Sequence, residues 1–118
     1  MLPAEALARI FRRKMLYWPD GIKIEPVNLP ATDPLRQAFS RHVLKMELAE
    51  LEDYWNQQYF HGIFPPYVLA SQEAVLRFVA DNPGAIGYVA GCAVDARVVV
   101  VLRIKVDELP GAGQGCAR

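Results

Sequence analysis

The polar residues best suited to hold a small ligand are Asn28, Thr32, Asp33 and Arg36, which lie close together in the chain. Apolar residues before Asn28 predict a strand, and Asp33 followed by Pro34 predicts the start of a helix. Ligands of open α/β sheets bind beyond the carboxyl ends of strands, where this turn would lie. Asn28 and Thr32 can hydrogen-bond a ligand there. Arg36, one turn into the helix, can hold an anion through two parallel hydrogen bonds.

The same residues also have a purely structural interpretation. Thr32 and Asp33 are typical of turns and helix caps, and Arg36 can form a surface ion pair with Asp33. The Asp33 carboxylate would accept from the N–H groups that a bound oxyanion needs, and it would repel a second negative charge. Ligand binding and simple capping are therefore both open for this segment.

The residues that commonly perform catalysis or bind metals are few and scattered. His42 falls in register with apolar residues of a predicted helix, which indicates a packed side chain, and His61 lies in a predicted loop. No Gly-x-Ser-x-Gly nucleophile motif accompanies either histidine. Cys92 and Cys116 lack the close paired spacing of a zinc site or a redox dithiol. The sequence thus predicts a protein that is not an enzyme and needs neither cofactor nor metal.

The elements that would position these residues alternate between helices and strands. Because Pro65 and Pro66 bar a helix, we expect residues 60–69 to form a loop. A continuous apolar run at 98–104 is typical of a strand covered on both faces. Interleaved helices and strands favour an α/β domain. Helices are predicted at about 3–14, from Asp33, over 48–59 and from Ser71 to Asn82, and strands at 22–27, 85–89 and 98–104.

Length and charge narrow the possible functions. The chain has 118 residues, which suits one domain and is too short for a two-lobed cleft protein. Thirteen Lys and Arg residues balance thirteen Asp and Glu residues, so no net field attracts nucleic acid. No apolar stretch approaches the roughly 20 residues of a membrane span, and residues 1–8 lack the apolar stretch of a signal peptide. We expect no nucleic-acid partner and no membrane insertion.

Three segments resemble the phosphate-type substrate-binding proteins of ABC transporters in their order along the chain. They are LARIFRRKMLYWPDG at 7–21, DPLRQAF at 33–39 and NPGAIGYV at 82–89. The resemblance covers about residues 3–104. It implies an α/β fold that is a single lobe of the type II periplasmic-binding-protein-like kind, with a mixed sheet flanked by about four helices. In this interpretation residues 1–106 form the lobe and residues 107–118 form a flexible Gly-rich tail.

The resemblance also implies a function and a location. It predicts a solute-binding-like domain similar to the phosphate transporter component, in the periplasm, with a small-molecule or oxyanion ligand. The family binds phosphate through a Ser-Gly-Thr type loop at a helix N-terminus. The matching stretch at 28–34 has no glycine, and a proline removes one N–H donor, so we expect weak or altered ligand binding. The alternative is a ligand-free protein interaction module that retains the lobe fold.

The family places an apolar strand before the first helix, and this sequence has none there. We therefore expect Leu7, Ile10 and Phe11 to leave apolar helix surface exposed. Exposed apolar surface and open strand edges favour association. The sequence accordingly predicts self-association or pairing with another protein lobe.

Overall fold

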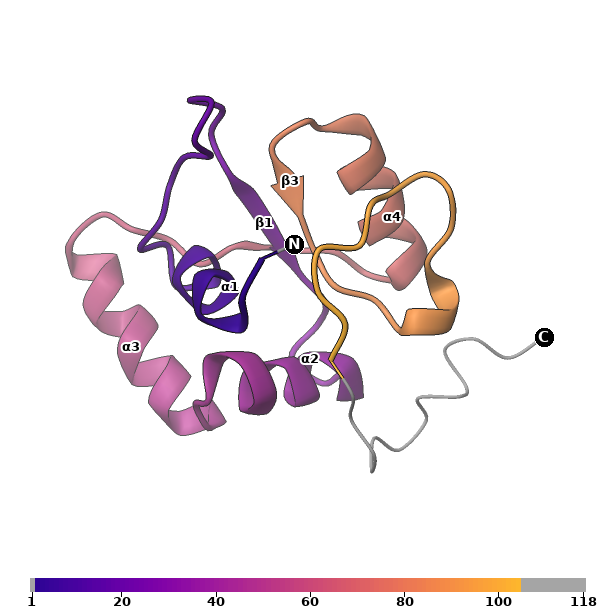
Figure 1. Ribbon diagram of the computed structural model, residues 1–118. Helices are drawn as coiled ribbons and strands as arrows, with labels where there is room; N and C mark the ends of the chain where they lie inside the picture. The colour runs from indigo at the N-terminus through magenta and orange to yellow at the C-terminus, as the bar shows by residue number, and fades with distance from the viewer. Residues whose placement is uncertain (1, 105–118) are drawn as a thin grey trace.

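The structure is a computed structural model that describes residues 2–104, in which short parallel strands are surrounded by helices (Figure 1). The predicted tail at 107–118 lies outside the described residues. The α/β class predicted from the sequence is confirmed. The elements are α1 (Ala4–Phe11), β1 (Glu25–Asn28), α2 (Pro34–Phe39), the π-helical turn η1 (Ser40–Leu44), α3 (Leu48–Phe60), β2 (Tyr67–Val68), α4 (Gln72–Asp81), β3 (Ala85–Ile86) and the 3₁₀ turn η2 (Gly91–Ala93).

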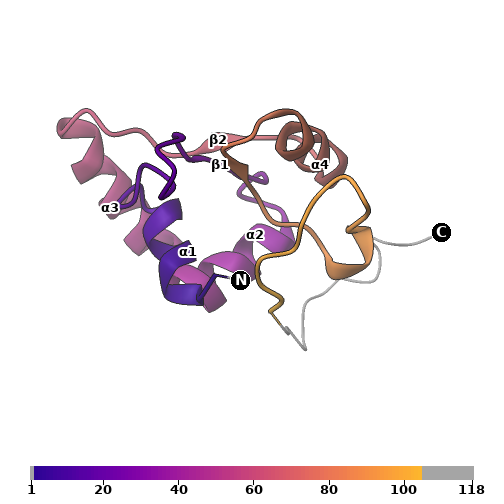
Figure 2. The same ribbon diagram turned by 45° about the horizontal axis from the view of Figure 1, so that its top comes forward.

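The sheet has the order β2-β1-β3, with β1 in the centre. Val27 pairs with Tyr67 and Glu25 pairs with Ala85, and both pairings are parallel. The mixed sheet expected from the resemblance is therefore wrong for these strands, because helical crossovers connect them and return the chain in the same direction. Figures 1 and 2 show α1 and α3 on one side of β1 and α4 on the other.

Residues 98–104 form no strand, which corrects the prediction of a buried one. The segment bends at Val98 and Val101 and joins no ladder, and Val99 is 87% exposed. The Leu2 N–H donates to the Val101 carbonyl at 2.9 Å, and this hydrogen bond joins the segment to the beginning of the described chain. The neighbouring strand β3 ends at Ile86, so it is too short to offer this run a continuous edge. The predicted loop at 60–69 contains the short strand β2, which sequence reasoning missed.

Helix α1 is buried against the rest of the chain. Leu7, Ile10 and Phe11 are 5%, 0% and 2% exposed, so the expected bare apolar surface on this helix is wrong. Phe39 of α2 contacts the Phe11 ring edge-on, with 4.7 Å between centroids. Arg12 closes this packing by donating from Nη2 to the Leu44 carbonyl at 2.7 Å. The helices α2 and η1 thus cover the surface that a leading strand was expected to cover.

The start of α4 follows its sequence signal, whereas two predicted buried stripes differ from the structure. Ser71 caps α4 by accepting from the Ala74 N–H at 3.1 Å, as predicted. His42, expected to pack inward, is exposed, while the next residue, Val43, is buried. The π-helical turn at Ser40–Leu44 explains this, because its wider turn shifts side chains away from the spacing of an α-helix. Tyr59, expected in the buried stripe of α3, is 62% exposed.

Candidate functional site

The predicted ligand residues meet at the turn between β1 and α2. Asn28 ends β1, and its side-chain oxygen Oδ1 accepts a hydrogen bond from the Tyr88 hydroxyl at 2.8 Å. The same hydroxyl accepts from the Leu29 N–H at 3.2 Å. The side-chain oxygen of Asn28 therefore has an internal partner, and the backbone carbonyl of Asn28 accepts from the Leu69 N–H at 2.8 Å.

Asp33 and Arg36 are also engaged within the chain. Asp33 Oδ1 accepts from the Leu35 N–H at 2.9 Å, which confirms the predicted cap. Arg36 Nη1 donates to the Leu29 carbonyl at 3.1 Å and forms no ion pair with Asp33 within residues 2–104. Thr32 is exposed and makes no side-chain hydrogen bond to the described residues. The structure thus brings the four predicted residues to one turn but commits three of them to holding that turn together.

Tyr88 is the residue at this turn that sequence reasoning missed. Its ring stacks on Phe39 with 4.2 Å between centroids and 6° between planes. Burial is the main cause that raises the pKa of Tyr88 to about 12, so the hydroxyl keeps its proton above the ordinary tyrosine pKa near 10. A buried tyrosine normally finds a hydrogen-bond partner for its hydroxyl. A Tyr in a predicted buried strand was therefore the available signal for an internal polar contact.

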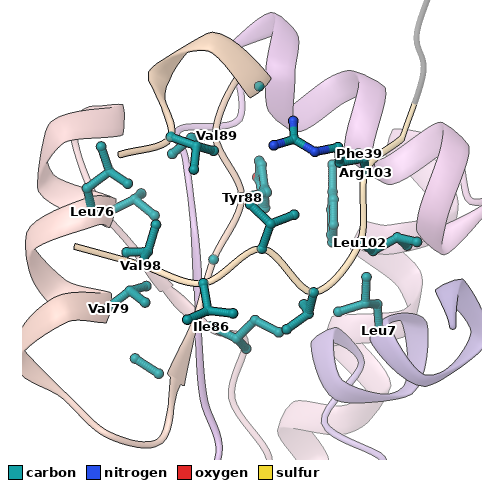
Figure 3. A pocket seen from close by; sticks show the side chains of 18 of the residues that line it. Leu7, Phe39, Leu76, Val79, Ile86, Tyr88, Val89, Val98, Leu102 and Arg103 are labelled. Atoms are coloured by element: carbon teal, nitrogen blue, oxygen red, sulfur yellow. The ribbon is translucent and has the colours of Figure 1, made fainter. Parts of the chain in front are cut away.

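A cavity of about 530 Å³ borders Tyr88 and Phe39 (Figure 3). Its walls come from α1, α2 and α4, from β3 and the residues that follow it, and from residues 94–104, which we call the covering segment. Most lining side chains are aliphatic or aromatic. The side chains that define its shape in Figure 3 include Phe39, Leu76, Val79, Ile86, Tyr88, Val98 and Leu102.

Gly87 allows the wall formed by the chain after β3 to sit close to its neighbours. A Cβ atom at this position would lie 2.6 Å from Val75 Cγ1 and 2.9 Å from Val27 Cγ2. Real Cβ atoms do not approach this closely, so only glycine fits without a shift of α4 or β1. This close approach is the structural role of Gly87, the second glycine of the GAIGYV segment.

A network of charged side chains attaches the covering segment to α4. Arg97 donates to Glu73 at 2.8 Å and to Asp95 at 2.7 Å, and Arg77 donates to Glu73 at 3.0 Å. The hydrogen bond from Arg97, followed by the one from Arg77, lowers the pKa of Glu73 to about 2. These side chains are at least one-third exposed, so solvent screens the ion pairs. The pairs add little to stability and mainly hold the covering segment beside α4.

Several other features bear on function. Neither His42 nor His61 makes a side-chain hydrogen bond to the described residues, and no cluster of metal-ligating side chains is found in residues 2–104. Cys92 lies in η2 and has a bonding partner, and Cys116 falls outside the described residues. No helix in the described part of the chain has the length and apolar character needed to cross a membrane. Comparison with protein-family models, curated proteins and solved structures found no match.

Proposed function

We propose that this chain is a non-catalytic solute-binding-like domain that holds a small, mostly apolar molecule in the cavity beside Tyr88. The observation that carries the proposal is the cavity itself. Its volume of about 530 Å³ lies within the range of roughly 300–1,000 Å³ that is usual for small-molecule sites. The resemblance to phosphate-type ABC transporter binding proteins supports the solute-binding class, a type II lobe and a periplasmic location.

The turn at 28–36 is a weaker candidate for the ligand site. An oxyanion there would need N–H donors, but Asp33 already accepts from Leu35 and Pro34 has no N–H to offer. To free the Leu35 N–H for a ligand, Asp33 would first have to give up its capping hydrogen bond, which destabilises the helix. We therefore expect phosphate to bind no tighter than about 1 mM, equivalent to about 4 kcal/mol of standard binding free energy.

The proposal is tested by titrating isotope-labelled protein with 1-octanol and, separately, with phosphate, and following backbone amide shifts by NMR. We expect octanol to shift the amides of Val79, Ile86 and Val98, and phosphate to leave the 28–36 amides unchanged below about 1 mM. Octanol shifts that avoid the cavity would overturn the proposal. Micromolar phosphate binding at 28–36 would also overturn it.

Val79→Trp provides a variant that fills the cavity, since Val79 lines it and is half-buried. We expect this change to abolish the octanol shifts while the spectrum elsewhere stays dispersed. The matched control is Val68→Trp, because Val68 is 55% exposed on β2 and does not line the cavity. The control should bind octanol like the original chain. Equal binding by both variants would contradict the assigned site.

A second candidate function, a protein interaction module, is favoured by an exposed aromatic patch beside the edge strand β2. Between positions 59 and 70 the sequence contains no Asp, Glu, Lys or Arg. Tyr59 contacts Phe60 and Phe64 edge-on, with ring centroids at 6.3 Å and 5.5 Å. Large exposed apolar patches commonly mark protein contacts. The exposed fractions are 62% for Tyr59, 86% for Phe60, 58% for Phe64 and 70% for Tyr67.

Sedimentation velocity at increasing concentration tests this second candidate through self-association. If the aromatic patch is an interface, the chain should associate and Phe60→Asp should abolish the association. Ile22→Asp is the control, because Ile22 is 42% exposed between α1 and β1 and belongs neither to the aromatic patch nor to the covering segment. A monomer at all micromolar concentrations, or equal effects of both variants, would argue against the patch.

A further inference from the structure

We propose that the cavity accepts an apolar molecule carrying one carboxylate group, and that Arg103 binds the carboxylate. This inference rests on the proposed function and specifies its ligand class. Arg103 belongs to the covering segment and lines the cavity together with the aliphatic residues around it. Figure 3 shows its side chain reaching across one end of the cavity toward η2.

The donors of Arg103 are unused within the described structure. Its guanidinium makes no hydrogen bond or ion pair with any residue in the range 2–104. Nη1 lies against Gly91, where an added Cβ would be 3.5 Å away. The other lining arginine, Arg97, is already held by Glu73 and Asp95. A guanidinium carries five N–H donors, so Arg103 can hold both oxygens of a carboxylate.

The charge of the lining is one-sided. The residues that line the cavity contain no Asp or Glu, and of its two arginines Arg97 is paired with Glu73 and Asp95, so Arg103 carries the arginine charge of the lining that has no partner within residues 2–104. A concave site with low-dielectric walls and charges of one sign concentrates ions of the opposite sign. The cavity therefore favours an anion at the end occupied by Arg103, while its aliphatic walls favour an apolar body beside Leu76 and Val79.

A monocarboxylate fits this arrangement better than phosphate does. Phosphate carries close to two charges and needs several donors around its oxygens, whereas the walls next to Arg103 are mostly hydrocarbon. Burying a charge without partners is costly, but a single carboxylate at the mouth can face Arg103 and water together. The apolar body of the ligand then gains from burial in the cavity interior.

The test compares octanoate with 1-octanol by calorimetric titration, because the two probes share an apolar chain and differ in charge. We expect octanoate to bind the original chain more tightly than octanol. Arg103→Gln should weaken octanoate binding about tenfold, equivalent to ~1.4 kcal/mol, and should change octanol binding less than about twofold. The matched control is Arg9→Gln, which removes the same charge from an exposed site on α1 away from the cavity lining.

The outcomes separate this inference from the proposed function. If both probes bind and Arg103→Gln leaves octanoate unchanged, the inference is wrong and the proposed function stands. If Arg103→Gln weakens both probes equally, Arg103 acts on the shape of the cavity rather than on charge, and the inference is also wrong. If neither probe binds the original chain at millimolar concentration, the proposed function and the inference both fail.

Discussion

Replacing Tyr88 by Phe tests how much the hydrogen bonds of the Tyr88 hydroxyl to the turn after β1 stabilise the fold. The substitution removes one oxygen and leaves the ring that stacks on Phe39. That oxygen donates to Asn28 Oδ1 at 2.8 Å and accepts from the Leu29 N–H at 3.2 Å. Two hydrogen bonds are lost, and the N–H left without a partner belongs to a residue that is 0% exposed.

The expected cost follows from that unsatisfied donor. A buried polar group without a partner costs about 1–3 kcal/mol, so Tyr88→Phe should lower the free energy of unfolding by about this amount. Asn28→Ala leaves the Leu29 N–H bonded to the hydroxyl, and the hydroxyl proton can turn to water at the half-buried place that Asn28 vacates, so it should cost about 0.5–1.5 kcal/mol. The order of the two variants is therefore a stronger test than either value.

Urea denaturation followed by tryptophan fluorescence and circular dichroism measures both costs, with an unchanged slope showing that the folded state keeps its compactness. The dependence of the free energy of unfolding on alkaline pH is an independent test. Because burial raises the pKa of Tyr88 to about 12, its contribution is fully present below the ordinary value near 10 and is lost as pH rises through about 12. Tyr88→Phe should lack this component. A cost below about 0.5 kcal/mol together with an unchanged alkaline profile would refute the reasoning.

Three further predictions concern separate parts of the fold. Asp33→Ala should cost about 0.5–2 kcal/mol and Asp33→Gly only a few tenths, with no tenfold gain in phosphate affinity for either; thermal unfolding and phosphate titration check this. Ile10→Ala should cost about 2–5 kcal/mol in urea denaturation, since Ile10 is 0% exposed. Glu73→Gln should speed amide exchange at Arg97 in the covering segment. In the original chain the Glu73–Arg97 ion pair contributes fully above the ordinary carboxylate pKa. Its contribution is lost as pH falls through the lowered pKa of Glu73, about 2, so the same loosening should appear over that range.

Local signals in the sequence predicted those parts of the fold that local chemistry determines. Asp33 and Ser71 have side chains that accept from N–H groups two or three residues later, and both caps are present in the structure. The apolar spacing of α1 predicted the helix and its apolar face, because one face of one helix decides that pattern, but not that α2 and η1 would bury this face. The predicted site residues were also correctly gathered at one turn, since a strand end and a helix start lie there.

The remaining features depend on contacts that are distant in sequence. Tyr88 lies 60 residues from Asn28, and no local pattern links the two. The inward prediction for His42 failed because a π-helical turn changed the spacing within a few residues. Strand β2 was missed because Pro65 and Pro66 favoured a loop. Prolines exclude a helix, but an edge strand can begin directly after them. No sequence pattern marks Arg103, because its proposed role depends on the cavity that it lines.

Amide exchange in the covering segment distinguishes a bound small molecule from a bound partner strand. None of the N–H groups of residues 99–104 donates a hydrogen bond within the described structure, although the run is rich in residues that favour strands. A partner strand that paired with this run would give these N–H groups acceptors, and the run carries Leu102, which lines the cavity. Bound octanoate should therefore leave the 99–104 amides exchanging rapidly, whereas a partner strand should slow them, because only pairing gives these amides acceptors. Slow exchange in octanoate-saturated monomer, measured by NMR, would show that the run finds acceptors within the chain, and it would contradict the open arrangement on which the cavity depends.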